Sequence, residues 1–383
     1  MPMIASLATR ELALDVVLVA LDLLGLFVGA RLLGRRGMED SGFLRDAALI
    51  VGFGVAWTLA TTLLVYLGLH TRFGAMRAAT HAVVFVTAPL AIGRGVLRCL
   101  GGSVGSGVVG IAGGLVVAAI YAWAHLVEPY RLEVTTHRIA TPRAARLARP
   151  VTVALVADVQ TDRVGDWEQH VFRVVADARP DLILFAGDYV QRADRERFRE
   201  ECAKFRAAVE RIEPWPPLGV LAVIGDVDPD RTIFSGTRVR LLEDEAVIAG
   251  AGLQVVGLTL ASSRRPFDEA LRARIEAFDG YSIVLGHAPD YSIPVIANRI
   301  RTEALLVAGH THGGQIVVPG FGPPMTLSRV PRRIAAGGMH EFGEARVCVS
   351  RGTGMERGMA PRVRLFCPPQ LVFFQIGPSV GGD

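Results

Sequence analysis

Five short apolar runs after residue 150 end in residues that can bind metal ions. They run into Asp158, Gly187-Asp188, Gly225-Asp226, His287 and His310-Thr311-His312. Carboxylate oxygens and neutral imidazoles are ligands of Mn, Fe and Zn centres. One carboxylate can bridge two ions about 3.5–4 Å apart, and such a pair lowers the pKa of a bound water towards ~7 and clamps phosphoryl oxygens. These residue types therefore predict a site for two divalent metal ions, which we expect to be Mn, Fe or Zn.

The segment His310-Thr311-His312-Gly313-Gly314-Gln315 carries the strongest signal. Alternate residues of an extended segment share a face, so His310 and His312 can converge on one pair of metal ions. The two glycines after them let the backbone pass close to a ligand. A lone aspartate after a strand is more often a turn or helix cap, and that alternative stays open for Asp162, Asp228 and Asp290.

Alternating strands and helices must position these residues. From Val151 onward, short apolar runs alternate with helical segments, which is typical of an α/β or layered α+β domain. Open sheets gather their ligand sites at the carboxyl ends of their strands. We therefore expect residues 151–383 to form one domain with the candidate residues along one edge of its sheets.

The first third of the chain is much more apolar than the rest. It holds four stretches near the ~20 residues that a helix needs to cross a bilayer, at about 12–33, 47–69, 80–100 and 104–127. We predict a transmembrane region over 1–130 and a juxtamembrane linker over 131–150. The first stretch could instead be a cleaved signal peptide, but its length and its two aspartates favour a membrane span. This third explains the mean hydropathy of +0.37, and the expected partner is a lipid bilayer.

Charged residues inside these stretches allow two interpretations. Asp15, Asp22, Arg94 and His81 either pack inside the bundle or at the membrane interface, or they form a polar pathway through it. The orientation is also open. The arginines after the first stretch favour an extracytoplasmic domain; they are Arg31, Arg35, Arg36 and Arg45. A nearly equal set favours the opposite orientation, namely Arg72, Arg77, Arg131 and Arg138.

The overall composition excludes some classes of protein. The chain has 383 residues and a net charge of +4, with 51% hydrophobic residues, so neither a disordered nor a collagen-like protein fits. The arginines are dispersed and form no dense block, so no nucleic-acid partner is expected. Four separated cysteines indicate neither a disulfide framework nor a cysteine metal site.

At this point the sequence resembles the calcineurin-like metallophosphoesterases, in the bacterial branch that has a G-H-T-H-G-G-Q motif. The resemblance covers about Thr152 to Ile376 and includes Val349–Gly354 and Pro368-Pro369-Gln370. It implies a four-layer sandwich of two mixed sheets flanked by helices, here following a four-helix transmembrane bundle. It also implies a dinuclear site that hydrolyses phosphomonoesters or phosphodiesters. Some members carry N-terminal membrane spans, so we expect a multi-pass protein of a bacterial cell membrane.

The resemblance also implies residue roles. By the family's motifs, Asp158 and His312 match ligands of the first metal, and Asp188 matches the carboxylate that bridges both ions. His287 and His310 match ligands of the second metal. The residues expected to act in catalysis are Asp188 and His310.

Three motifs depart from the family pattern. Gln160 replaces a metal histidine, and its amide oxygen is a weaker neutral ligand. Asp226 replaces an asparagine and can still bind the second metal through oxygen. Val227 replaces a histidine that protonates the leaving oxygen, and losing an acid-base group costs ~10²–10⁴ in rate. Gln191 replaces the last aspartate of the family's G-D-x-x-D motif, which begins at Gly187-Asp188.

These departures leave three functional hypotheses. The first is a membrane-anchored phosphoesterase acting on a phosphomonoester, phosphodiester or pyrophosphate of a small molecule or lipid. The second is a catalytically weakened domain that binds metal and a phosphorylated ligand as a membrane sensor or scaffold. The third makes the helical bundle the working part, with the other domain regulating transport. The sequence indicates no oligomeric state.

Overall fold

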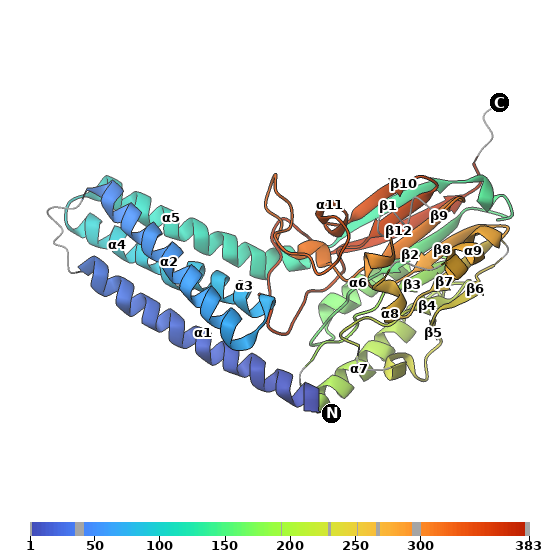
Figure 1. Ribbon diagram of the computed structural model, residues 1–383, viewed down its shortest axis with the longest axis horizontal. Coiled ribbons are helices and arrows are strands. Elements are labelled where there is room, and N and C mark those ends of the chain that lie inside the picture. The colour runs from blue at the N-terminus through green and yellow to red at the C-terminus, as the bar shows by residue number, and fades with distance from the viewer. Residues whose placement is uncertain are drawn as a thin grey trace. The chain divides into compact units, whose positions relative to one another are not determined.

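The computed structural model describes residues 2–34, 42–192, 194–228, 231–250, 252–265, 269–292 and 300–379. The chain divides into two compact units. The first comprises 1–127 with Arg357–Arg362, and the second comprises Glu128–Glu356 with Val363–Asp383. Figure 1 shows the long helices of the first unit and the two sheets of the second.

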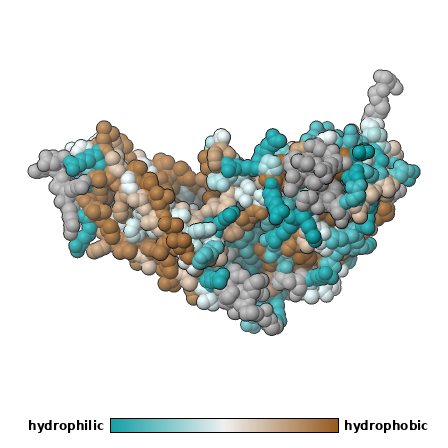
Figure 2. Space-filling view, viewed as in Figure 1, coloured by the Kyte–Doolittle hydropathy of each residue, from teal (hydrophilic) through white to brown (hydrophobic). Residues whose placement is uncertain are grey.

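Four long helices make up most of the first unit. They are α1 (Pro2–Gly34), α2 (Phe43–Leu69), a third helix in which α3 (Arg72–His81) continues through a π-helical stretch (Ala82–Thr87) into α4 (Ala88–Leu100), and α5 (Val104–Ala122), which continues as a π-helix to Val127. Within the described residues, four candidate membrane spans are long and apolar enough, by length and composition, to cross a bilayer: Thr9–Gly34, Phe43–Leu69, Arg72–Leu100 and Val104–Tyr130. Large apolar side chains are exposed along these helices, and Figure 2 shows hydrophobic residues gathered over them. The four predicted apolar helices are therefore present.

The third helix begins earlier than the apolar pattern predicts. Its first residue is Arg72, and the side chain of Thr71 caps it by accepting a hydrogen bond from the backbone of Gly74. Its first turns contain polar residues, so hydropathy alone places the start near residue 80. Arg35 and Arg36, which count toward the orientation, lie outside the described residues.

Several charged side chains of the helices contact one another. Arg77 contacts Asp15 at 2.5 Å, and His81 contacts Asp22 at 3.0 Å. Arg94 and Arg98 share Asp46, at 2.9 and 2.6 Å. A charge at a bilayer centre costs ~2.5–3.5 kcal/mol on insertion scales, and pairing reduces that cost. Asp15, Asp22 and Arg94 thus each have a partner side chain within the helical unit, which agrees with the internal-packing interpretation.

The second unit contains two six-stranded sheets. The first has the order β1-β12-β2-β3-β4-β5 and the second has the order β10-β11-β9-β8-β7-β6. The strands of the first sheet are β1 (Glu133–Ala140), β12 (Gln370–Gly377), β2 (Val151–Val156), β3 (Leu182–Phe185), β4 (Val220–Ala222) and β5 (Arg240–Leu241). Those of the second are β6 (Glu245–Ile248), β7 (Leu253–Gly257), β8 (Tyr281–Leu285), β9 (Ala304–Ala308), β10 (Gly338–Phe342) and β11 (Ala345–Val349). Both sheets are mixed, because β12 runs antiparallel to β2, β6 to β7 and β10 to β11, while the other pairs are parallel.

Alternating side chains of the strands build four layers. One set from both sheets, including Val153, Leu184 and Ile283, forms a shared core between them. Intervening residues of the first sheet pack with Phe172 of α6 (Asp166–Asp177) and Phe205 of α7 (Arg195–Glu210). Those of the second sheet pack with side chains of α9 (Glu269–Ala277) and α11 (Arg332–Ala335). Two mixed sheets flanked by helices were predicted, and this fold class is confirmed.

One difference concerns the segment 131–150, for which a linker is predicted. Its residues Glu133–Ala140 form β1, which pairs along its full length with β12 in parallel. This edge strand is mostly exposed, with only Ile139 buried, so it lacks the apolar run that reveals the inner strands. The arginines and prolines that suggest a linker lie mainly after it.

Candidate metal centre

The carboxyl ends of five parallel strands bring the predicted residues together. Asp158 follows β2, Asp188 follows β3, Asp226 follows β4, His287 follows β8, and His310 and His312 follow β9. Two clusters result, each with ligand atoms within 4.8 Å of one another: Asp188, Asp226, His287 and His310 in the first, and Asp158, Asp188 and His312 in the second. Asp188 belongs to both clusters. A carboxylate shared in this way is what two neighbouring metal ions require.

Strained backbone turns these side chains inward. Asp158, Asp188, His310 and His312 all have positive φ, between 46° and 71°. Such conformations cost of order 1–3 kcal/mol each for residues other than glycine, and they concentrate at functional sites. Gly225 supports the same packing, because a Cβ there would lie 2.0 Å from Asp188 Oδ1. The loops are therefore shaped around the clustered side chains.

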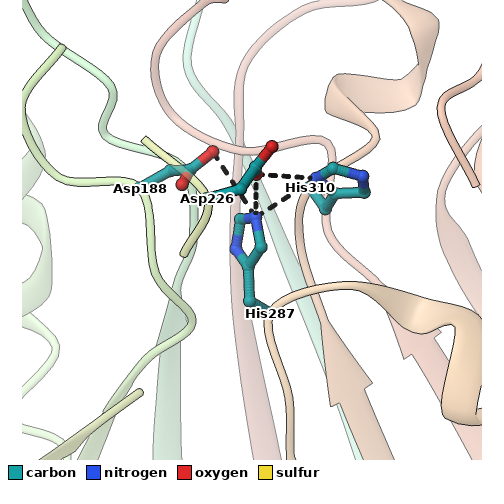
Figure 3. Close-up of side chains that lie close together, drawn as sticks. All are labelled: Asp188, Asp226, His287 and His310. Carbon is teal, nitrogen blue, oxygen red and sulfur yellow. Dashed lines mark hydrogen bonds and ion pairs between the residues drawn. The ribbon is translucent and has the colours of Figure 1, made fainter. Parts of the chain in front are cut away.

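Asp226 contacts both histidines of the four-residue cluster (Figure 3). Its Oδ1 lies 2.8 Å from His287 Nε2 and 3.1 Å from His310 Nδ1. The two histidine nitrogens are 3.2 Å apart, and Asp188 Oδ2 lies 3.5 Å from His287 Nε2. His287 Nδ1 contacts the carbonyl oxygen of Ala186 at 2.8 Å. When Nδ1 donates that bond, Nε2 is left as the ligand atom, an arrangement common for metal-binding histidines.

The charges of this cluster fit a bound cation. Burial raises the pKa of Asp188, and it raises the pKa of Asp158 to about 6. Burial alone would lower the pKa of His287, but Asp188 and Asp226 raise it to about 10. Burial likewise opposes the shift at Asp226, where hydrogen bonds from His287 and His310 hold its pKa below the usual range. Several carboxyl groups thus lie close together in a buried site, where a divalent cation would stabilise their negative charge.

His312 provides a direct test of whether the other cluster suits a metal. The residue is 5% exposed, and within the described residues neither of its ring nitrogens has a hydrogen-bond partner. Burial, followed by the charge of Arg364, lowers its pKa, so the imidazole is neutral. Leaving a buried polar group unsatisfied is costly. A metal ion between His312, Asp158 and Asp188 would satisfy it, so the residues fit the ion.

Further acidic side chains hold the loops in place. Asp228 accepts hydrogen bonds from the backbone nitrogens of Asp188, Tyr189 and Gly225, at 2.8–2.9 Å. Asp158 accepts the backbone N–H of His310 with both oxygens at 2.9 Å. Asp228 therefore ties the loop after β3 to the loop after β4, which agrees with the turn role left open for it.

Gln160 lies in a polar network that the sequence did not indicate. Its Nε2 donates to Gln191 Oε1 at 3.0 Å and to Glu356 Oε2 at 2.9 Å. Gln191 Nε2 donates to Glu356 Oε1 at 2.7 Å. Two of the positions that depart from the family pattern thus bind one half-buried carboxylate. Glu356 follows no apolar run and lies 196 residues from Gln160, so no sequence signal connects it to the site.

Val227 brings no side-chain proton donor to the cluster, since its side chain is a hydrocarbon. Its backbone N–H donates to Asp188 Oδ1 at 3.0 Å. His170 packs against Trp167 on α6, and His340 on β10 contacts the carbonyl of Gly337. Neither histidine belongs to the two clusters found among the described residues.

Residues 151–314 match the family of calcineurin-like phosphoesterases. The second unit therefore contains a domain similar to this family. It is 24% identical over 283 residues to the uncharacterized metallophosphoesterase YkuE of Bacillus subtilis, covering 69% of this chain and 92% of that protein. It is 27% identical over 274 residues to the phosphodiesterase YaeI of Escherichia coli, covering 67% and 92%. A solved dimetal phosphatase from Danio rerio is 12% identical, covers 53% of this chain and 88% of its own, and has a TM-score of 0.36.

The match to this family supports hydrolysis of phosphoric esters by a metal-dependent enzyme. The family assignment made from the motifs is therefore confirmed. The roles of the individual residues remain predictions, although the structure brings Asp158, Asp188, Asp226, His287, His310 and His312 together.

Proposed function

We propose that the phosphoesterase domain uses two divalent metal ions to hydrolyse a phosphorylated small molecule or lipid beside a membrane. Asp158, Gln160, Asp188 and His312 would hold the first ion, and Asp188, Asp226, His287 and His310 the second. When bound, such a pair supplies hydroxide near neutral pH and polarises phosphoryl oxygens. The observation that supports this proposal most is the position of Asp188 in both clusters.

The chain's own residues would prepare the site before substrate arrives. Asp228 fixes the loop that carries Asp188, and the backbone of Ala186 orients His287. Asp188 and His310, which lie nearest to the reacting atoms in this proposal, are already turned inward by their backbone. Less reorganisation is then needed when the phosphoryl group binds.

The mixed donor set does not select one metal. Carboxylate oxygens, an amide oxygen and imidazole nitrogens suit Mn, Fe or Zn. The four candidate membrane spans support an anchored enzyme, and a phosphorylated lipid or a lipid-linked pyrophosphate would be accessible to such an enzyme. This part of the proposal follows from location alone.

The second candidate function is a sensor or scaffold that binds metal and a phosphorylated ligand without fast turnover. The observation that favours it is Val227, which has no proton to give to a leaving group. One experiment separates the two functions. The full chain in detergent, loaded with Mn²⁺, is assayed on p-nitrophenyl phosphate, bis-p-nitrophenyl phosphate and inorganic pyrophosphate.

Turnover that Asp188→Asn abolishes would support the enzyme. Binding of two Mn²⁺ ions with no turnover on any of the three substrates would support the sensor. Failure to bind Mn²⁺, Fe²⁺ or Zn²⁺ would overturn both functions.

A further inference from the structure

An arginine lies at the metal centre where the family pattern gives no reason to expect one. Arg264 follows the short helix α8 (Leu260–Ser263), and its Nη2 lies 2.8 Å from Asp226 Oδ2. The side chain of Arg264 is 45% exposed and that of Asp226 is 31% exposed. The guanidinium therefore lies where the cluster meets solvent, on the side from which a substrate can approach.

The two oxygens of Asp226 have different neighbours. Oδ1 contacts His287 and His310, as the dashed lines in Figure 3 show, while Oδ2 contacts Arg264. A cation held by Oδ1 and a guanidinium held by Oδ2 can therefore be bound together. They would be separated by a single carboxylate group.

This contact links two departures from the family pattern. An asparagine at position 226 would present one oxygen and one NH₂ group, and an NH₂ group cannot accept a bond from a guanidinium. Asp226 supplies the second acceptor that holds Arg264. The neighbouring Val227 removes the family's histidine, so the site loses one cationic donor and Arg264 supplies another.

Stability alone gives a weak reason for this ion pair. Exposed salt bridges contribute only ~0–1 kcal/mol because solvent screens them. The next residue, Arg265, makes a local contact instead, with its Nε donating to the carbonyl of Ala261 at 3.1 Å. Two adjacent arginines thus differ in that one is directed to the cluster and the other is not.

We propose that Arg264 binds a non-bridging oxygen of the substrate's phosphoryl group and stabilises the negative charge that develops there. This inference rests on the proposed function. A planar guanidinium suits phosphate because it offers several donors in a fixed fork and keeps its charge at all relevant pH values.

The same chemistry limits the substrate. Hydroxide forms the new P–O bond, and the leaving oxygen takes the electron pair of the bond that breaks. Arg264 does not release a proton, so the leaving group departs as an anion or takes its proton from water. The site is therefore suited to leaving groups of low basicity, such as the phosphate released from a pyrophosphate.

The test is binding of inorganic phosphate to the Mn²⁺-loaded full chain in detergent, measured by isothermal titration calorimetry. Charged hydrogen bonds are worth enough that Arg264→Ala should weaken phosphate binding by about 10- to 100-fold. Arg264→Lys should retain part of the affinity. Arg265→Ala is the matched control, because it removes the same charge one residue away and should leave phosphate affinity unchanged.

Two further measurements separate the role of Arg264 from a structural one. Arg264→Ala should still bind two Mn²⁺ ions and keep the wild-type melting temperature. The inference is overturned if Arg264→Ala binds phosphate as the wild type does, if Arg265→Ala weakens binding equally, or if loaded wild-type protein binds no phosphate. Failure of the wild type to bind Mn²⁺ would instead overturn the proposed function itself.

Discussion

The carboxylate of Glu356 accepts a hydrogen bond from the amide nitrogen of Gln160 at 2.9 Å, and this contact fixes which atom of the amide can bind a metal. The second N–H of the same nitrogen donates to Gln191. A carboxylate can only accept, so the amide cannot turn over without losing both bonds. Oε1 is then the atom of Gln160 available as a ligand. Glu356 thus gives Gln160, the proposed ligand, a defined orientation.

Glu356→Gln should weaken binding of the first metal ion by about 10- to 100-fold, the usual effect of losing a group that orients a ligand. An amide at position 356 can donate as well as accept, so Gln160 is no longer held in one orientation. Calorimetric titration of the metal-free chain with Mn²⁺ measures this change. In a Gln160→His background the same substitution should have little effect, and an equal loss there would contradict the orienting role.

Val227→His should speed hydrolysis of substrates with basic leaving groups, by up to about 10²-fold, since an acid-base group contributes ~10²–10⁴. Val227 is half-buried beside Asp226, and its backbone already contacts Asp188. An alkyl phosphate needs a proton on its leaving oxygen and should benefit most, whereas p-nitrophenyl phosphate should gain little. Steady-state rates on both esters give the comparison. Equal rates for the variant and the wild type on both esters would show that the loop does not place residue 227 near the leaving group.

Strand ends were predictable from the sequence because burial leaves a clear pattern. Inner strands such as β3 and β9 are continuous apolar runs, and the chain leaves each one at a residue that can bind metal. Parallel neighbours then carry those residues to one edge without further information. The family pattern supplied the roles, and the fold class followed from both.

Other parts of the site could not be predicted, for physical reasons. Glu356 and Arg264 lie in loops, where no periodicity relates sequence position to spatial position. Each contacts a clustered residue through tertiary folding alone, and each is an ordinary charged residue in the sequence. The length and pairing of β1 could not be predicted, because an exposed edge strand needs no apolar run.

Metal affinity should rise with pH between about 5 and 8. In the metal-free protein Asp158 has a pKa of about 6 and His287 a pKa of about 10, both above their ordinary values. A metal ion must displace those protons, so binding becomes easier as their concentration falls. Titration with Mn²⁺ at several pH values, in buffers that do not bind the metal, measures the effect. Affinity that is constant or falls across this range would contradict the assignment of these residues as ligands.

The same protons predict the stability of the metal-free protein. A pKa that is higher in the folded than in the unfolded state stabilises the fold below the unfolded value, and this contribution is lost as pH rises through the folded value. The stabilising contribution of Asp158 is lost as the pH rises to about 6. That of His287 is lost between about pH 6.5 and 10. The lowered pKa of Asp226 gives a contribution that is constant over this range. The lowered pKa of His312 acts in the opposite direction, but only below its unfolded value near 6.5. The melting temperature in EDTA should therefore fall from about pH 7.5 to 9, and excess Mn²⁺ should reduce that fall; a rise over this range would contradict it.

Asp46 should be the most important acidic residue for the stability of the helical unit. It is shared by Arg94 and Arg98, and Asp46 and Arg94 are each 5% exposed. Removing one partner of a buried ion pair costs about 3–5 kcal/mol, because the other charge stays buried. Asp46→Ala should therefore lower the free energy of unfolding in detergent by that order, measured by titration with a denaturing detergent. Asp15→Ala is the control, since Asp15 is 49% exposed beside Arg77 and its loss should lower the free energy of unfolding by less than Asp46→Ala does. Equal losses in the two variants would show that burial does not set the strength of these pairs.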